Sequence, residues 1–190
     1  NVQVTAKGSI DLRDNKNLIN VQAKIDTLNL HKINLARQKV FIHADVDINM
    51  RGLTLDSLVG TAELKNLTLN YKDQWLRQDS LSIITTRSNE QRSMHLQSEV
   101  VDAKVEGDFY YSTLFRDVPV LVNEFILNIK NDRLALTEYY LQKPVSGQHY
   151  TANFTIKLKD LQPVTSLLSL NLDAGKNIDI EAKFTYGNTN

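Results

Sequence analysis

Apolar and polar residues alternate along much of this chain, and this period of two constrains the fold more than any other feature. Between Val2 and Leu12 the even positions carry apolar residues or glycine, whereas every odd position is polar. Similar alternation returns at 40–50, 101–109, 152–158 and 178–186. Successive side chains of a β-strand point to opposite faces, so each segment predicts a strand with one apolar and one polar face.

The pattern therefore predicts a mainly β fold. We expect strands at 2–12, 18–26, 39–50, 58–70, 79–86, 93–98 and 100–111, and again over the alternating segments 152–158 and 178–186. Segment 27–37 is less regular and predicts a connection or a short edge strand. In 58–70 the apolar stripe keeps its phase only if a bulge or bend falls near Lys65 and Asn66.

Two regions break the period. At 117–130 apolar residues recur every three or four positions, which favours a helix with Asp117 as N-cap, although its valines also allow a strand. At 160–169, Asp160 precedes a short helical turn. Segment 131–149 has no clear period and predicts an exposed loop or linker. This divides the chain into a β-rich segment ending in a helix at 1–130, the linker at 131–149, and a β-rich continuation at 150–190.

The composition of the chain excludes several classes of function. The chain of 190 residues has 22 basic and 22 acidic side chains, so no net field attracts nucleic acid or an anionic membrane. Cysteine is absent, which excludes disulfides and thiolate metal sites without choosing a compartment. No apolar run is long enough to span a bilayer, and no secretory leader is apparent. Both ends read as cut from a longer protein, although a processed mature protein would look similar.

The residues predict no enzyme, cofactor or metal site. His31, His43, His95 and His149 are too far apart in sequence to form a local metal pair, and we interpret them as solvated surface residues. Asp45 and Asp47 share a polar strand face, but nothing nearby completes an oxygen cage for a cation. No phosphate-binding loop, nucleophile elbow or serine–lysine motif occurs.

The apolar face carries the remaining signal. One interpretation is an ordinary sandwich core, sealed by a second sheet. The other is an open groove, because medium-sized aliphatic side chains dominate the face, with few aromatic residues and no buried polar constellation. Burying a methylene group contributes roughly 0.8 kcal/mol, so an acyl chain of about 16 carbons would gain on the order of 10 kcal/mol before entropic costs. Such a groove would hold lipid without specific hydrogen bonds.

Three sequence segments run from a strand into a polar turn and then into leucine-bearing residues, at 58–69, 103–114 and 154–168. Because of these segments the chain, from about 40 to 187, resembles the AsmA/TamB family, and most closely its TamB-like translocation and assembly module proteins. The resemblance implies a "β-taco", which is a long curved sheet folded around an apolar groove. It also implies a periplasmic location, with an inner-membrane anchor in a segment absent from this chain.

Members of that family are implicated in moving phospholipid between the membranes and in outer-membrane biogenesis with a barrel partner. By this resemblance the chain is a middle fragment whose partners are phospholipids, while any barrel protein would be met by regions outside it. We expect acyl chains to contact one alternating set of residues: Val40, Ile42, Ala44, Val46, Ile48, Leu58, Ala62, Leu64, Val101, Ala103, Val105, Phe109, Ala152, Phe154, Ile156, Leu158, Ile178, Ile180, Ala182 and Phe184.

Two alternatives stay open at this point. A chaperone-like module would pair a free sheet edge with an unfolded outer-membrane strand by β-augmentation. A plain structural β-sandwich in a surface or adhesion protein would have a closed core that excludes hydrophobic probes.

Overall fold

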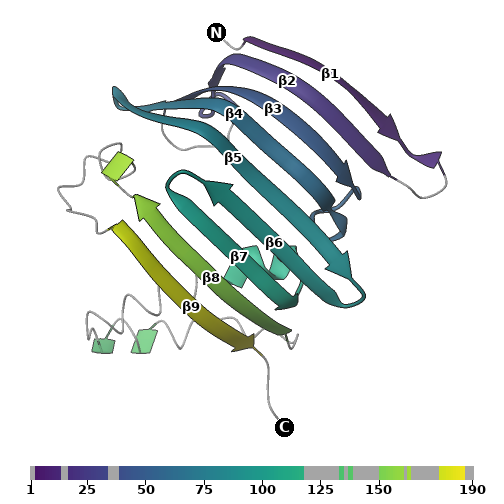
Figure 1. Cartoon of the computed structure of the whole chain (residues 1–190), viewed down its shortest axis with the longest axis vertical. Helices are drawn as coiled ribbons and strands as arrows, with labels where there is room; N and C mark the ends of the chain where they lie inside the picture. Colours follow the sequence, from purple (N-terminus) through teal and green to yellow (C-terminus); the bar gives the residue numbers. More distant parts are fainter. Residues whose placement is uncertain are drawn as a thin grey trace.

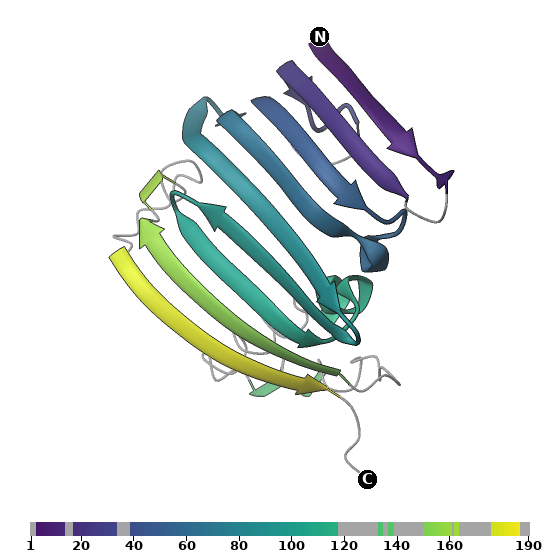
Figure 2. The same ribbon diagram turned by 45° about the vertical axis from the view of Figure 1, so that its right-hand side comes forward.

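The chain folds into one nine-stranded antiparallel sheet whose strands are neighbours in sequence order, from β1 at one edge to β9 at the other (Figure 1). The computed structural model describes residues 3–13, 17–33, 39–117, 133–134, 137–138, 150–160, 162–163 and 176–186. The mainly β fold predicted from the alternation is confirmed, and the strands form an open, curved sheet (Figure 2).

The strand bounds follow the alternating segments of the sequence. They are β1 Gln3–Asp11, β2 Leu18–Asn29, β3 Val40–Arg51, β4 Val59–Tyr71, β5 Gln74–Ser88, β6 Gln91–Ser98, β7 Val101–Asp108, β8 Tyr150–Asp160 and β9 Lys176–Tyr186. A single 3-10 turn, η2 (Leu55–Ser57), lies between β3 and β4.

Strand register brings the apolar positions into continuous rows, because directly opposed residues of neighbouring strands share a face. The first row crosses all nine strands without a polar side chain: Gly8, Val21, Ile48, Ala62, Ile83, Leu96, Ala103, Ile156 and Ile180. The second row has Thr85 as its one polar member: Ile10, Ile19, Met50, Gly60, Thr85, Met94, Val105, Phe154 and Ala182. The sheet therefore has one apolar and one polar face.

Register shifts run through the first strands. They fall between Gln3 and Val4 in β1, between Ile25 and Leu28 in β2, and between His43 and Asp45 in β3. In β4, Asn66 has φ +52°, a left-handed conformation that asparagine tolerates better than most residues. The bulge predicted near Lys65 and Asn66 is confirmed, and it keeps Leu67 and Leu69 in phase with Leu64.

Three predicted strand limits are wrong. Strand β2 ends at Asn29, not 26, so the start of segment 27–37 continues this strand. Strand β5 begins at Gln74, not 79, because Lys72 (φ +49°) and Asp73 (φ +63°) form a tight two-residue hairpin turn. That turn lacks the Asn-Gly or Asp-Gly dipeptide by which such hairpins are recognised in sequence. Strand β7 ends at Asp108, not 111, although Phe109 and Tyr111 continue the alternation. Both side chains are buried instead, Phe109 just before a helical segment and Tyr111 as the first residue of that segment.

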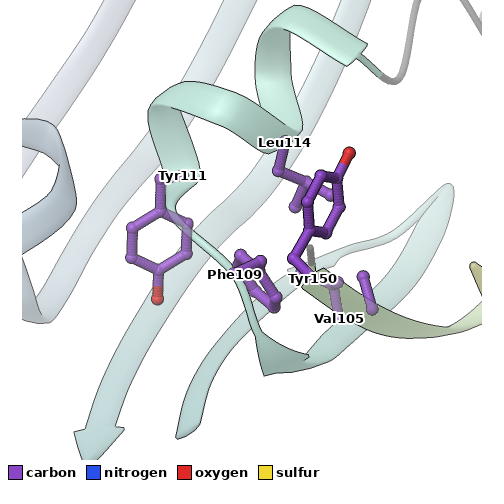
Figure 3. Packing of buried hydrophobic residues seen from close by; sticks show 6 residues of the cluster. Val105, Phe109, Tyr111, Leu114 and Tyr150 are labelled. Carbon is purple, nitrogen blue, oxygen red and sulfur yellow. The ribbon is translucent and has the colours of Figure 1, made fainter. Parts of the chain in front are cut away.

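That helical segment, residues 111–117, covers the apolar face over the C-terminal strands. Its Tyr111 and Leu114 pack with Val105, Phe109 and Tyr150 in the core cluster (Figure 3), which Ala152 completes. Tyr111 and Phe109 meet edge to face, with ring centroids 5.5 Å apart. Leu114 follows Tyr111 by three positions, the spacing that places two side chains on one helix face.

The expected N-cap at Asp117 is wrong, because Asp117 is itself helical and helical residues 111–116 precede it. Residues 118–130 lie outside the described part of the chain. In the predicted loop 131–149, residues 133–134 and 137–138 are helical, and the Thr137 hydroxyl donates to the Arg133 carbonyl oxygen (2.8 Å). Asp160 does begin a helical turn as predicted, since its Oδ1 accepts from the Gln162 N–H at 2.9 Å.

The described strands form a single sheet, so they do not build the sandwich that the sequence left open. Over the described residues, no helix is long and apolar enough to cross a membrane.

Candidate functional site

The apolar face is the candidate site, and the structure gathers nearly all of the predicted lining on it. Register and alternation place the strand members of the predicted set together on this face. Two members lie outside the strands: Leu58 follows the η2 turn and Phe109 follows β7. The set that the sequence predicted is therefore one surface, formed by β3, β4 and β7–β9.

The chain itself covers one part of this surface. Val105, Phe109 and Ala152 are at most 4% exposed within the core cluster, and Phe154 and Phe184 pack against it. Tyr150 packs on Phe184 with ring centroids 5.7 Å apart. These predicted lining residues contact the chain's own helical segment and its neighbours, so this part of the face is filled.

The rest of the face is open to different degrees. At the β1 edge Val4 and Ile10 are 45% and 64% exposed, and at the β9 edge Ile178 and Ile180 are each 41% exposed. Between these edges Val46, Ile48 and Leu64 are half-buried, and Ala44 is fully buried. Apolar side chains thus remain accessible over β1–β5 and at the 178–180 end of β9.

The face also carries buried polar side chains, contrary to the expectation that it had none. Thr85 lies within the second row, and Gln78 and Arg92 are 4% and 2% exposed. Neither Gln78 Oε1 nor Arg92 Nε has a hydrogen-bond partner among the described residues. The sequence offered one signal, because Arg92 stands two positions before Met94 and so shares its face.

The opposite face is polar. One of its rows reads Lys7, Gln22, Asp47, Glu63, Ser82, Gln97, Asp102, Lys157 and Asp179. Two hollows open there, one of about 380 Å³ lined mainly by charged and amide side chains of β1–β4 and one of about 210 Å³ beside Phe41, His43 and Trp75. No cluster of potential metal ligands occurs within the described ranges, which include Asp45 and Asp47.

The solvated histidines predicted from sequence are only partly observed. His31 is exposed, His43 and His95 are half-buried, and His149 lies outside the described residues. His95 Nε2 is 2.6 Å from Asp102 Oδ1, and the Lys159 ammonium is 4.0 Å from Asp102 Oδ2. The hydrogen bond from His95 is the main reason that the pKa of Asp102 lies below its ordinary value. This cluster has the contacts of a structural ion pair.

Comparison with known proteins identifies no relative. No family model matches the chain, and neither a curated protein nor a solved structure matches it.

Proposed function

We propose that this chain is a periplasmic segment of a lipid-conduit protein, which binds phospholipid acyl chains on the apolar face during transport between the inner and outer membranes. The proposal extends to a parent protein anchored in the inner membrane and active in outer-membrane biogenesis. One observation carries it: the two apolar rows continue across all nine strands, and part of that surface stays accessible. Large exposed apolar patches on folded proteins commonly mark binding surfaces.

The dimensions suit an acyl chain. Neighbouring strands lie about 4.8 Å apart, so the four steps from β1 to β5 span about 19 Å. One leaflet of a bilayer with a hydrocarbon core about 30 Å thick holds acyl chains about 15 Å long. The accessible part of the face is therefore long enough for one acyl chain lying across the strands.

Native mass spectrometry and lipid extraction on protein purified from a bacterial periplasm test this function. We expect co-purified phospholipid, and we expect its loss when Ile48→Asp places a charge in the first row on β3, because an unpaired charge in an apolar site is costly. Asn49→Asp is the matched control, since Asn49 is exposed on the polar face of the same strand. Circular dichroism confirms that both variants are folded. Lipid retained by a folded Ile48→Asp variant would contradict the proposal.

The open edge of β1 favours a second candidate, a chaperone-like module that captures unfolded outer-membrane strands by β-augmentation. Among the described strands, β1 pairs only with β2, and its residues Gln3 to Ile10 are exposed. Backbone N–H groups of successive residues point to opposite sides of a strand. Of the two variants Ala6→Pro and Lys7→Pro, one therefore removes an N–H donor from the open edge, and the other removes one that faces β2. Loss of peptide capture in one of these variants, with capture intact in Ile48→Asp, would favour the chaperone over the conduit.

A further inference from the structure

We propose that Arg92 and Arg87 form a phosphate-binding site at one end of the apolar face and hold the head group of the bound phospholipid. This inference rests on the proposed function, because it assigns the polar end of the same ligand. The two arginines are directly opposed on β6 and β5, one strand position beyond the opposed pair Thr85 and Met94 on the same face. Both therefore lie beside the middle of the second apolar row, at the end of the face where β5 and β6 join.

Arg92 is a buried cation that has no ion-pair partner among the residues that the structure describes. Arg92 is 2% exposed, and no ion pair among the described residues includes it. Its Nη1 donates to the Glu90 carbonyl oxygen at 3.4 Å, while Nε has no partner there. Buried charges in proteins are normally paired, so this guanidinium has an unused capacity to bind an anion.

Arg87 adds a second positive charge beside the first. Like charges directly opposed on neighbouring strands destabilise a sheet, yet these two guanidinium-bearing residues are register partners. The Arg87 Nε donates to the Asn89 carbonyl oxygen at 3.2 Å, and its side chain is exposed. An anion bound between the two would remove this repulsion, and phosphate suits the fork-shaped donor set of arginine.

The neighbouring described side chains leave the guanidinium groups of Arg87 and Arg92 available to an anion. Asp56, on the connection between β3 and β4 at this end of the sheet, uses both carboxylate oxygens on Ser112. The Arg92 guanidinium carbon is 4.4 Å from the centre of the Tyr110 ring, and Tyr110 is itself 44% exposed. Opposite Arg92 on β7 stands Gly107, which contributes no side chain. The ring of Tyr110 therefore covers the Arg92 guanidinium at the surface. Displacement of this exposed ring would admit a phosphate.

The test compares a lipid that carries a phosphate head group with one that has the same acyl chains and no phosphate. Purified full chain, delipidated and refolded, is titrated with phosphatidylglycerol, with diacylglycerol bearing the same acyl chains, and with inorganic phosphate. We expect phosphatidylglycerol to bind about tenfold more tightly than diacylglycerol, the effect of one charge-assisted contact. We expect Arg87→Gln and Arg92→Gln to reduce that preference. Arg77→Gln is the matched control, because Arg77 is an exposed arginine on the polar face of β5.

The outcomes separate this site from the groove. Equal binding of the two lipids by the wild-type chain, or an unchanged preference in a folded Arg87→Gln variant, overturns the phosphate site and leaves the groove standing. If neither lipid binds, the proposed conduit fails, and the head-group assignment fails with it. In that case phosphate binding that depends on Arg87 identifies a site for free phosphate. Arg87→Gln preserves the test if Arg92→Gln does not fold.

Discussion

The carboxylate of Asp56 accepts two hydrogen bonds from Ser112, from its backbone N–H at 2.9 Å and from its hydroxyl at 2.6 Å. Asp56 lies in the η2 turn between β3 and β4, whereas Ser112 lies in the first turn of helical segment 111–117. The pair therefore ties the segment that covers β6–β9 to a connection in the N-terminal half of the sheet.

Removing this link should loosen the helical segment. We expect Asp56→Ala to reduce the free energy of unfolding by about 1 kcal/mol, the usual effect of losing a helix-capping carboxylate. Urea denaturation of Asp56→Ala, Ser112→Ala and the double variant measures the coupling between the two residues. Additive effects of the two substitutions would show that the hydrogen bond from the Ser112 hydroxyl contributes nothing to stability.

A second contact holds Asp117 of the same segment. The Tyr150 hydroxyl donates to Asp117 Oδ2 at 2.8 Å, and both residues are buried. We expect Tyr150→Phe to destabilise the fold by about 1–3 kcal/mol, because a buried carboxylate oxygen loses its donor. Tyr110→Phe is the control, since its ring is partly exposed. Equal denaturation midpoints for the two variants would contradict a stabilising role for the Tyr150 hydroxyl.

Members of the predicted lining should differ in their effect on stability. Phe109 is 1% exposed within the core cluster, whereas Ile180 is 41% exposed near the β9 edge. We expect Phe109→Ala to cost about 3–5 kcal/mol, as large-to-small core substitutions do. For Ile180→Ala we expect about 1 kcal/mol or less, because much of its side chain is already in water. Chemical denaturation of both variants tests which part of the face is structural core.

Acid should weaken the His95–Asp102 pair. The hydrogen bond from His95 lowers the pKa of Asp102 below the ordinary value of 3.8. A carboxyl group with a lowered folded-state pKa stabilises the fold above its unfolded pKa, and this contribution is lost as pH falls through the folded pKa. Relative to Asp102→Asn, the wild-type chain should therefore lose stability as the pH falls below about 4. A constant difference across this range, measured by urea denaturation, would show that the pair does not stabilise the fold.

Much of the sheet could be predicted from local pattern, and the exceptions have physical reasons. The alternation at 18–26 and 40–50 predicted strands because a half-buried strand needs one apolar face. It failed at Phe109 and Tyr111, where the same alternation continues but the side chains are buried just before and at the start of a helical segment. It also missed the hairpin at Lys72 and Asp73, because backbone pairing imposed a left-handed conformation on residues that rarely adopt it.

The sequence by itself determined which residues form strands and which side of each strand is apolar, because both follow from a period of two along the chain. Only the tertiary structure decided what each face contacts. Strand order and register joined the separate stripes into rows such as the one from Gly8 to Ile180. Arg92 is buried and lies opposite Arg87 on the neighbouring strand, and Asp56 contacts Ser112 on another element. No local pattern encodes such pairings, since they depend on how the whole sheet is assembled.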